Sequence, residues 1–192
     1  LVADKLKATS GSRIAALAGD LAAVEEMFAL KALMTSLGSS NLDCRQDGAA
    51  HDPALGRVSY LFNPTVAGIE QADVILVVGS NPRLESPVLN ARIRKRWRQG
   101  AVRIGVIGEA TAMTWRYEHL GAGPKSLEAI VRGEGDFAAA LKAAKKPIVI
   151  VGQAALARPD GRPVLALAAR AVGLATGADA GWNGLAVLHT AA

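Results

Sequence analysis

ADVILVVGSNPRLESPVLNARIRKRWRQG, residues 72–100, is the most informative stretch of this chain. It opens on Val74–Val78, an unbroken apolar run that is rich in β-branched residues and ends at Gly79. A run without polar alternation is typical of a strand that is buried on both faces of a parallel sheet. We therefore expect a central parallel strand here.

A helix is predicted directly after this strand. Ser86 suits the N-cap, Pro87 suits the first helical turn because it has no N–H group to lose, and Gly100 suits the end. Three apolar residues recur every four positions and therefore share one face: Leu89, Ile93 and Trp97. Most of the remaining surface of this helix is cationic.

Positive charge is concentrated around this helix. Residues 83–103 contain seven basic residues and one acidic residue, whereas the rest of the chain contains 15 basic and 16 acidic residues. The formal net charge of +5 therefore arises from one segment. Since it lacks the helix-turn-helix, RNP or zinc-finger patterns of nucleic-acid binders, we expect a helix side that is solvated or faces a partner, and its Arg and Trp residues suit docking onto an acidic protein surface.

The rest of the chain repeats a pattern of strand, glycine and helix. Further strands are predicted at residues 13–18, 102–107 and 147–151, each followed by a glycine. Helices are predicted at residues 4–9, 21–37, 126–132, 136–144, 162–172 and 182–189, with Asp20 as a cap for the second of these. This alternation predicts an α/β fold, a doubly wound and mainly parallel sheet flanked by helices. Residues 41–64 and 111–123 are expected to be irregular, and an active site would be sought in the first of them.

Length and composition restrict the class of protein. At 192 residues with 51% hydrophobic residues, the chain can build a globular core. Its apolar runs are far shorter than the ~20 residues of a membrane-spanning helix. One cysteine, Cys44, excludes an internal disulfide and a multi-thiolate cluster within the chain. The opening LVADKLKATS has no initiator Met and no targeting signal, so we expect a segment of a longer polypeptide.

Candidate sites for small molecules give weak signals. Glycines at strand ends could expose helical N–H groups to a phosphate, at Gly19-Asp20, Gly79-Ser80-Asn81-Pro82, Gly108-Glu109-Ala110 and Gly152-Gln153-Ala154. None of them matches GxGxxG or GxxxxGK[ST], so tight turns are the favoured explanation. Cys44 and His51 could form a nucleophilic pair, but no third group that would orient them is evident. We expect His119 and His189 to be packing or surface residues.

Four long motifs carry a resemblance to a known family: NLDCRQDG (residues 41–48), YLFNPTVAGIEQADVILVVGSNPRLESPVLNARIRKRW (60–97), YEHLG (117–121) and AKKPIVIVG (144–152). Together they resemble, in the correct order, the family of large iron–sulfur subunits of bacterial NADH–quinone oxidoreductase, which is respiratory complex I. A subunit of that family looks like an iron–sulfur N-terminal region that is fused to a domain of the molybdopterin oxidoreductase type. The resemblance implies that residues 1–192 are a part of this second domain, with a subdomain break, if there is one, near residues 109–125.

The resemblance also implies a lost active site. Active molybdopterin enzymes carry a Cys, selenocysteine or Ser metal ligand where this chain has Ala49 and Ala50, and Asp-Pro-Arg where it has Gly108–Ala110. A metal ligand and a phosphate-binding guanidinium are therefore missing. We expect no catalytic, cofactor-binding or metal-binding residue in this chain, and iron–sulfur clusters only in the preceding part of the full subunit.

Three functions remain as hypotheses. The first is a structural, non-catalytic domain of complex I, which transfers electrons from NADH to quinone through clusters held elsewhere. Its partners would be other peripheral-arm subunits, at the cytoplasmic face of the bacterial inner membrane or the matrix side in a eukaryote. We expect no nucleic acid and no direct membrane insertion. The alternatives are an active molybdopterin-dependent oxidoreductase domain and a soluble nucleotide-binding module.

Overall fold

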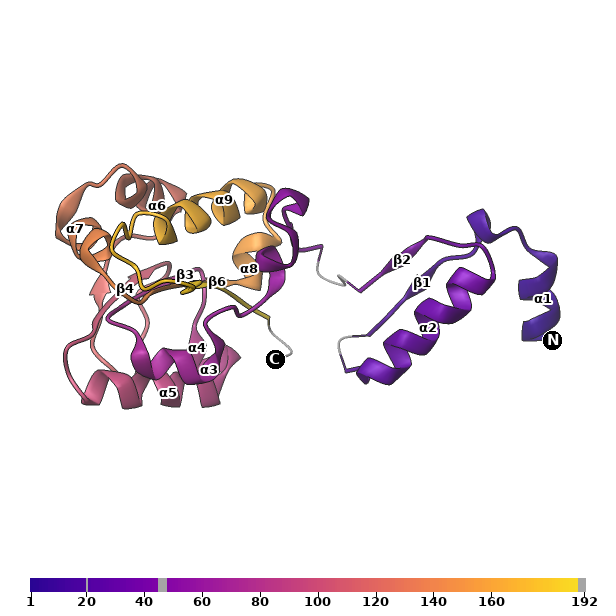
Figure 1. The fold of residues 1–192 in the computed structure, drawn as a ribbon, viewed down its shortest axis with the longest axis horizontal. Coiled ribbons are helices and arrows are strands. Elements are labelled where there is room, and N and C mark those ends of the chain that lie inside the picture. The colour runs from indigo at the N-terminus through magenta and orange to yellow at the C-terminus, as the bar shows by residue number, and fades with distance from the viewer. Residues whose placement is uncertain (20, 45–47, 190–192) are drawn as a thin grey trace. The chain divides into compact units, whose positions relative to one another are not determined.

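The computed structural model describes residues 1–19, 21–44 and 48–189, and the chain forms two compact units, Leu1–Gly48 and Ala49–Thr190. Figure 1 shows the helices and strands of both units. The region of the expected subdomain break, residues 109–125, lies inside the second unit. The predicted cap residue Asp20 lies outside the described residues.

The first unit places a helix beside a small parallel sheet. Its elements are α1 (Val2–Ala8), a 3-10 turn (Gly11–Arg13), β1 (Ala16–Leu17), α2 (Val24–Ser36) and β2 (Leu42–Asp43), with β1 parallel to β2. The strand predicted at residues 13–18 is shorter than expected because its partner β2 has only two residues. At the start of α2 the Ala23 N–H group donates to the carboxylate of Glu26 at 2.8 Å.

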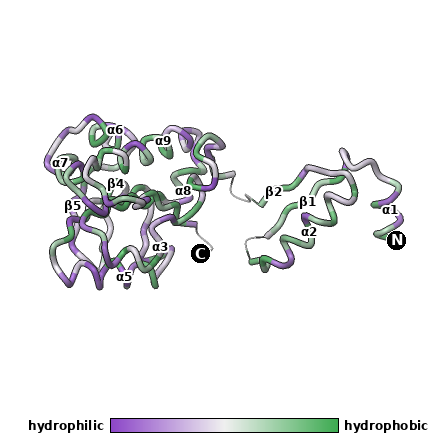
Figure 2. The backbone as a smooth tube through the Cα atoms, in the orientation of Figure 1, coloured by the Kyte–Doolittle hydropathy of each residue, from purple (hydrophilic) through white to green (hydrophobic). Residues whose placement is uncertain are grey.

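The apolar face of α2 is largely exposed, whereas the sequence predicts that it is covered. Val24 is 79% exposed and Phe28 74%, and Leu21 just before the helix is 90% exposed, while Met34 is buried. Figure 2 shows the apolar residues along this helix. Two strands of two residues each offer too little surface to cover a helix of 13 residues.

The second unit is built on a parallel sheet in the order β5-β4-β3-β6-β7. The strands are β3 (Val74–Val78), β4 (Arg103–Ile107), β5 (Glu118–His119), β6 (Pro147–Gly152) and β7 (Leu185–Leu188). Every pairing between these strands is parallel, and Ile75 of β3 lies between Ile104 of β4 and Ile148 of β6. The predicted α/β fold class with a central strand at β3 is confirmed.

Two edge strands differ from the prediction. The prediction of a helix over residues 182–189 is wrong. Leu185–Leu188 forms a strand that pairs with β6 and continues the sheet. Its side chains alternate between the two faces of the sheet, with Val187 in one core cluster and Ala186 in the other. The short strand β5 lies in the segment 111–123 that was expected to be irregular.

Helices cover both faces of the sheet, as Figure 1 shows. One face carries α3 (Thr65–Gly68), α4 (Pro82–Glu85) and α5 (Pro87–Arg98); the other carries α6 (Pro124–Val131), α7 (Gly135–Ala143) and α9 (Gly161–Val172). The short helix α8 (Gln153–Leu156) follows β6, and 3-10 segments span Pro53–Tyr60 and Ile69–Gln71. Among the described residues, no helix is long and apolar enough to cross a membrane.

The helix α5 matches the predicted amphipathic pattern closely. Leu89 and Ile93 are buried against the sheet, and Trp97 is half-buried against the same cluster. Ser86 occupies the N-cap position, but its side chain makes no capping hydrogen bond. Asn90 is also buried, and its side-chain oxygen has a partner there because it accepts a hydrogen bond from the indole N–H of Trp115 at 2.8 Å.

An ion pair fastens the edge strand β5 to β4. The guanidinium of Arg103 donates twice to the carboxylate of Glu118, once at 2.8 Å, and its Nη1 donates to the Asp136 carbonyl at 2.9 Å. The same guanidinium lies 5.6 Å from the centre of the Phe137 ring. Hydrogen bonding from Arg103 lowers the pKa of Glu118 below its ordinary value.

This pKa shift predicts a pH-dependent stability. A carboxyl group with a lowered pKa stabilises the fold above its unfolded pKa, and this contribution is lost as the pH falls through the folded pKa. We expect Glu118→Gln to be less stable than the wild type near about pH 7, and we expect the difference to be smaller near about pH 3, below the ordinary pKa of a glutamate. Urea unfolding at both pH values measures this difference. Glu109→Gln is the control because Glu109 is exposed and has no ion pair among the described residues; a similar loss there would contradict the assignment to the Arg103 pair.

Candidate functional site at the carboxyl edge of the sheet

A cavity of about 240 Å³ lies at the carboxyl ends of β3 and β4. Gly79 and Gly108 from the two strand ends, Gly123 and Pro124 at the start of α6, and Arg158 after α8 contribute to its wall. This is the edge at which open α/β sheets bind their ligands, near the point where the strand order reverses between β3 and β6. It is therefore the first place to look for a binding site.

The reversal point itself is closed by direct contact between the loops that follow β3 and β6. A Cβ atom built on Gly152 would lie 2.4 Å from the carbonyl oxygen of Gly79 and 2.8 Å from Cβ of Ser80. One built on Gly79, which has a φ of +58°, would lie 2.6 Å from Cβ of Ala155. Gly79 after β3 and Gly152 at the end of β6 therefore allow close packing of the two loops, which leaves no room for a ligand between them.

The loop after β3 uses its own hydrogen-bond donors. Glu85 Oε1 accepts from the backbone N–H of Asn81 at 2.6 Å, and Glu85 Oε2 accepts from the hydroxyl of Ser80 at 2.9 Å. The side chain of Asn81 accepts from the N–H of Arg83 at 3.2 Å. The carboxylate of Glu85 thus holds the position that an anionic ligand would take at a strand-to-helix turn.

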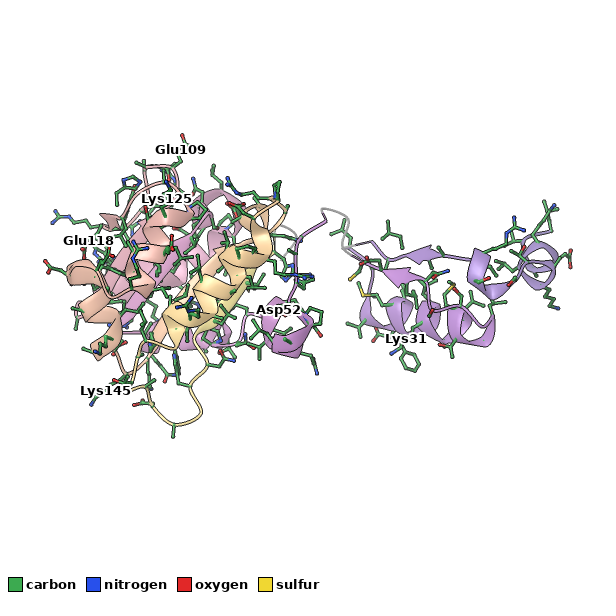
Figure 3. All side chains as sticks on the ribbon, turned by 90° about the horizontal axis from the view of Figure 1, so that it is seen from above. Lys31, Asp52, Glu109, Glu118, Lys125 and Lys145 are labelled. Atoms are coloured by element: carbon green, nitrogen blue, oxygen red, sulfur yellow. The ribbon has the colours of Figure 1, made fainter. Side chains whose placement is uncertain are left out.

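The loop after β4 is held in a similar way. The Gly108 N–H donates to the Gly121 carbonyl at 2.9 Å, and Nε2 of His119 lies 2.8 Å from the Gly108 carbonyl, which can only accept. Glu109 is exposed and points away from the fold (Figure 3). His119 is therefore a surface residue with a positioning contact, which agrees with the expectation from sequence.

Arg158 is the one charged or polar side chain among the described residues that line the cavity. It donates to both carboxylate oxygens of Asp160, at 2.7 and 3.0 Å, and Asp160 raises the pKa of its guanidinium. The remaining wall is glycine and apolar side chains. Small-molecule sites usually enclose about 300–1,000 Å³ and present several convergent polar groups. A pterin cofactor with its phosphates does not fit these residues.

The position at which the resemblance places a metal ligand lies next to this edge. Ala49 is fully buried in the core cluster between the sheet and helices α6, α7 and α9, and the N–H of Ala50 donates to the Leu156 carbonyl at 2.9 Å. A methyl group buried in a core offers no lone pair to a metal ion. Among the residues that the structure describes, no group of three or more His, Cys, Asp and Glu side chains could hold a metal.

The two members of the Cys–His pair considered from sequence belong to different units. Cys44 is exposed in the first unit, and His51 is half-buried in the second. The His51 ring instead lies 5.7 Å from the Tyr60 ring and 6.5 Å from the His189 ring, and His189 Nε2 lies 2.8 Å from the Tyr60 carbonyl. The sequence carries no signal for this aromatic cluster, because its members are separated by up to 138 positions.

Comparison with known proteins agrees with the fold. Residues 1–192 match the family model described as molybdopterin oxidoreductase. The G subunit of NADH-quinone oxidoreductase is 45% identical to this chain over 166 residues in Rickettsia felis and 41% identical over 188 residues in Rickettsia bellii. These matches cover 86% and 98% of this chain, but 25% and 28% of those proteins, so the chain spans about a quarter of their length.

A solved structure shares the fold at low sequence identity. A chain of the formyltransferase/hydrolase complex from Methylorubrum extorquens, in complex with methylofuran, superposes with a TM-score of 0.63 and 23% identity. The match covers 98% of this chain and 56% of that one. The family match and the named relatives confirm the resemblance stated from the sequence motifs, and the superposition confirms the α/β fold class.

Proposed function

This chain belongs to the molybdopterin oxidoreductase family, and on that premise we propose that it is a structural, non-catalytic part of the large iron–sulfur subunit of an NADH–quinone oxidoreductase. The names of its relatives support the choice of complex. In this role the assembly transfers electrons from NADH to quinone through iron–sulfur clusters held outside this chain. The chain itself supplies shape and contact surface.

The observation that carries the proposal is the closed reversal point between β3 and β6 at the carboxyl edge of the sheet. Glu85 already occupies the N–H group of Asn81 at the turn after β3, and Gly152 packs against Gly79 at the reversal point. A catalytic member of the family needs this edge for its cofactor, so an edge whose donors bond within the chain favours a structural role. The alternative is an active molybdopterin-dependent oxidoreductase.

The surroundings follow from the same proposal. Its partners are other subunits of the peripheral arm, and its location is the cytoplasmic face of the bacterial membrane, or the matrix side in a eukaryote. It associates with the membrane through those partners rather than by inserting a segment of its own, and it has no nucleic-acid ligand. Attachment of a tag to the full subunit in its own bacterium tests this: the tagged protein should co-purify with NADH–quinone oxidoreductase activity and without stoichiometric molybdenum or tungsten.

Filling the cavity distinguishes the structural role from the catalytic one. Ala122 lines the cavity, and Ala122→Leu adds three more carbon atoms to its lining. We expect the NADH oxidation rate per assembled complex to stay within about twofold of the wild type, because the electrons pass through clusters held outside this chain. A twofold change corresponds to a difference of about 0.4 kcal/mol between the two activation barriers. The control is Ala139→Leu, at an exposed position of α7 outside the cavity. A rate that drops by orders of magnitude for Ala122→Leu alone, with normal assembly, would favour the molybdopterin alternative.

A further inference from the structure

Most of the basic residues around α5 are engaged within the chain. Arg92 and Lys95 both pair with the carboxylate of Glu70, the latter at 2.7 Å. Lys95 and Arg92 lower the pKa of Glu70, so it stays ionised. Arg96 donates to three carbonyl oxygens, the nearest that of Ala72 at 2.6 Å. The charge of this helix is thus partly used to fasten it to the fold.

Arg94 and Arg98 differ from these neighbours. Both are exposed, and among the described residues neither has a hydrogen bond or an ion pair. They are one helical turn apart, so their side chains lie side by side. The helix dipole favours a cation in the last turn, which accounts for Arg98 but not for Arg94, since the effect fades within that turn.

Two apolar side chains just before and at the start of α5 are exposed. Leu84 at the end of α4 is 75% exposed, and Val88 in the first turn of α5 is 73% exposed. Val88, Ala91, Arg94 and Arg98 follow one another along one side of the helix at intervals of three and four. A surface hollow is lined by Ala91, Arg94, Lys95, Arg98 and Gln99. The stripe is apolar at one end and cationic at the other.

We propose that Leu84, Val88, Arg94 and Arg98, here called the α5 stripe, form a docking surface for an acidic protein segment of a neighbouring subunit. The partner places two carboxylates against the guanidinium groups, where bidentate hydrogen bonds are available, and an apolar side chain against Leu84 and Val88. This inference rests on the proposed function, since it identifies a contact within that assembly. Charge complementarity determines the partner, because in the described part of the chain Glu70 pairs with the other two cations of this helix side and leaves Arg94 and Arg98 uncompensated.

The test uses the full subunit in the assembled complex, with two double variants that remove the same charge. Arg94→Gln with Arg98→Gln removes the cations of the α5 stripe, whereas Arg92→Gln with Lys95→Gln removes the two that bind Glu70. We expect the Arg94 and Arg98 variant to weaken retention in the complex by about tenfold, or roughly 1.4 kcal/mol, relative to the Arg92 and Lys95 variant. In the wild type, retention should fall as salt rises, and this dependence should be smaller in the first variant. Leu84→Ser with Val88→Ser should weaken retention at every salt concentration.

A photo-crosslinker at position 88 identifies the occupant. A cross-linked peptide from another subunit that carries at least two nearby Asp or Glu residues supports the proposal. Cross-linking to lipid or nucleic acid, to a peptide without acidic residues, or to nothing would overturn it, as would normal retention of the Arg94 and Arg98 variant. Unfolding midpoints of the Arg94 and Arg98 variant and of the Leu84 and Val88 variant should match the wild type, which excludes misfolding as the cause. If the wild-type subunit does not co-purify with the oxidoreductase at all, the proposed function fails instead.

Discussion

Gly152→Ala is expected to lower the free energy of unfolding by about 3 kcal/mol, because the new methyl group would overlap backbone atoms of the loop after β3. The Cβ atom would lie 2.4 Å from the carbonyl oxygen of Gly79 and 2.8 Å from Cβ of Ser80. The backbone of Gly152 has a φ of −71°, which alanine adopts freely, so the cost arises from contact and not from conformation. Urea unfolding of the variant measures it.

Gly177→Ala is the matched control for this prediction. A Cβ atom there meets nothing within 4 Å, so the substitution should leave stability unchanged or raise it by up to about 1 kcal/mol. Equal stability of both variants would show that the loops after β3 and β6 are not in contact. The closed edge, and with it the main support for a structural role, would then be lost.

Ile93→Ala is expected to cost about 3–4 kcal/mol, because Ile93 is fully buried between α5 and the sheet. Val88→Ala on the same helix is the control, and it should change the free energy of unfolding by less than about 0.5 kcal/mol. Chemical denaturation of both variants measures the free energy of unfolding for a substitution on each side of the helix. If both changes cost the same, the face that carries Arg94 and Arg98 would be packed rather than exposed, and the α5 stripe could not bind a partner.

The predicted strand and helix of residues 72–100 are encoded locally. Val74–Val78 is apolar at every position, so it suits burial on both faces regardless of which strands lie beside it. Leu89 and Ile93 share a face because the helix repeats every 3.6 residues, and this face had to be the buried one. The same reasoning locates β4, β6, α6, α7 and α9 to within a few residues.

Local patterns were insufficient where a segment is short and apolar. Residues 185–188, LAVL, are compatible with a strand or with a turn of helix. Pairing with β6 decides the matter, and the segment before β3 then covers the outer edge, with Asn63 donating to the Leu185 carbonyl at 2.7 Å. The apolar face of α2 is the opposite case, because periodicity predicts a buried face and the described residues of the first unit offer too little surface to bury it.

The state of the candidate site depended still more on contacts between distant residues. The sequence by itself determined the α/β class, the positions of the glycines after the strands, and the concentration of positive charge in residues 83–103. Only the tertiary structure decided that Gly79 and Gly152 close the reversal point and that Glu70 binds Arg92 and Lys95 but not Arg94. The physical reason is range: hydrophobic periodicity and turn chemistry act over a few residues, whereas loop packing and ion pairs join residues that are brought together only when the sheet forms.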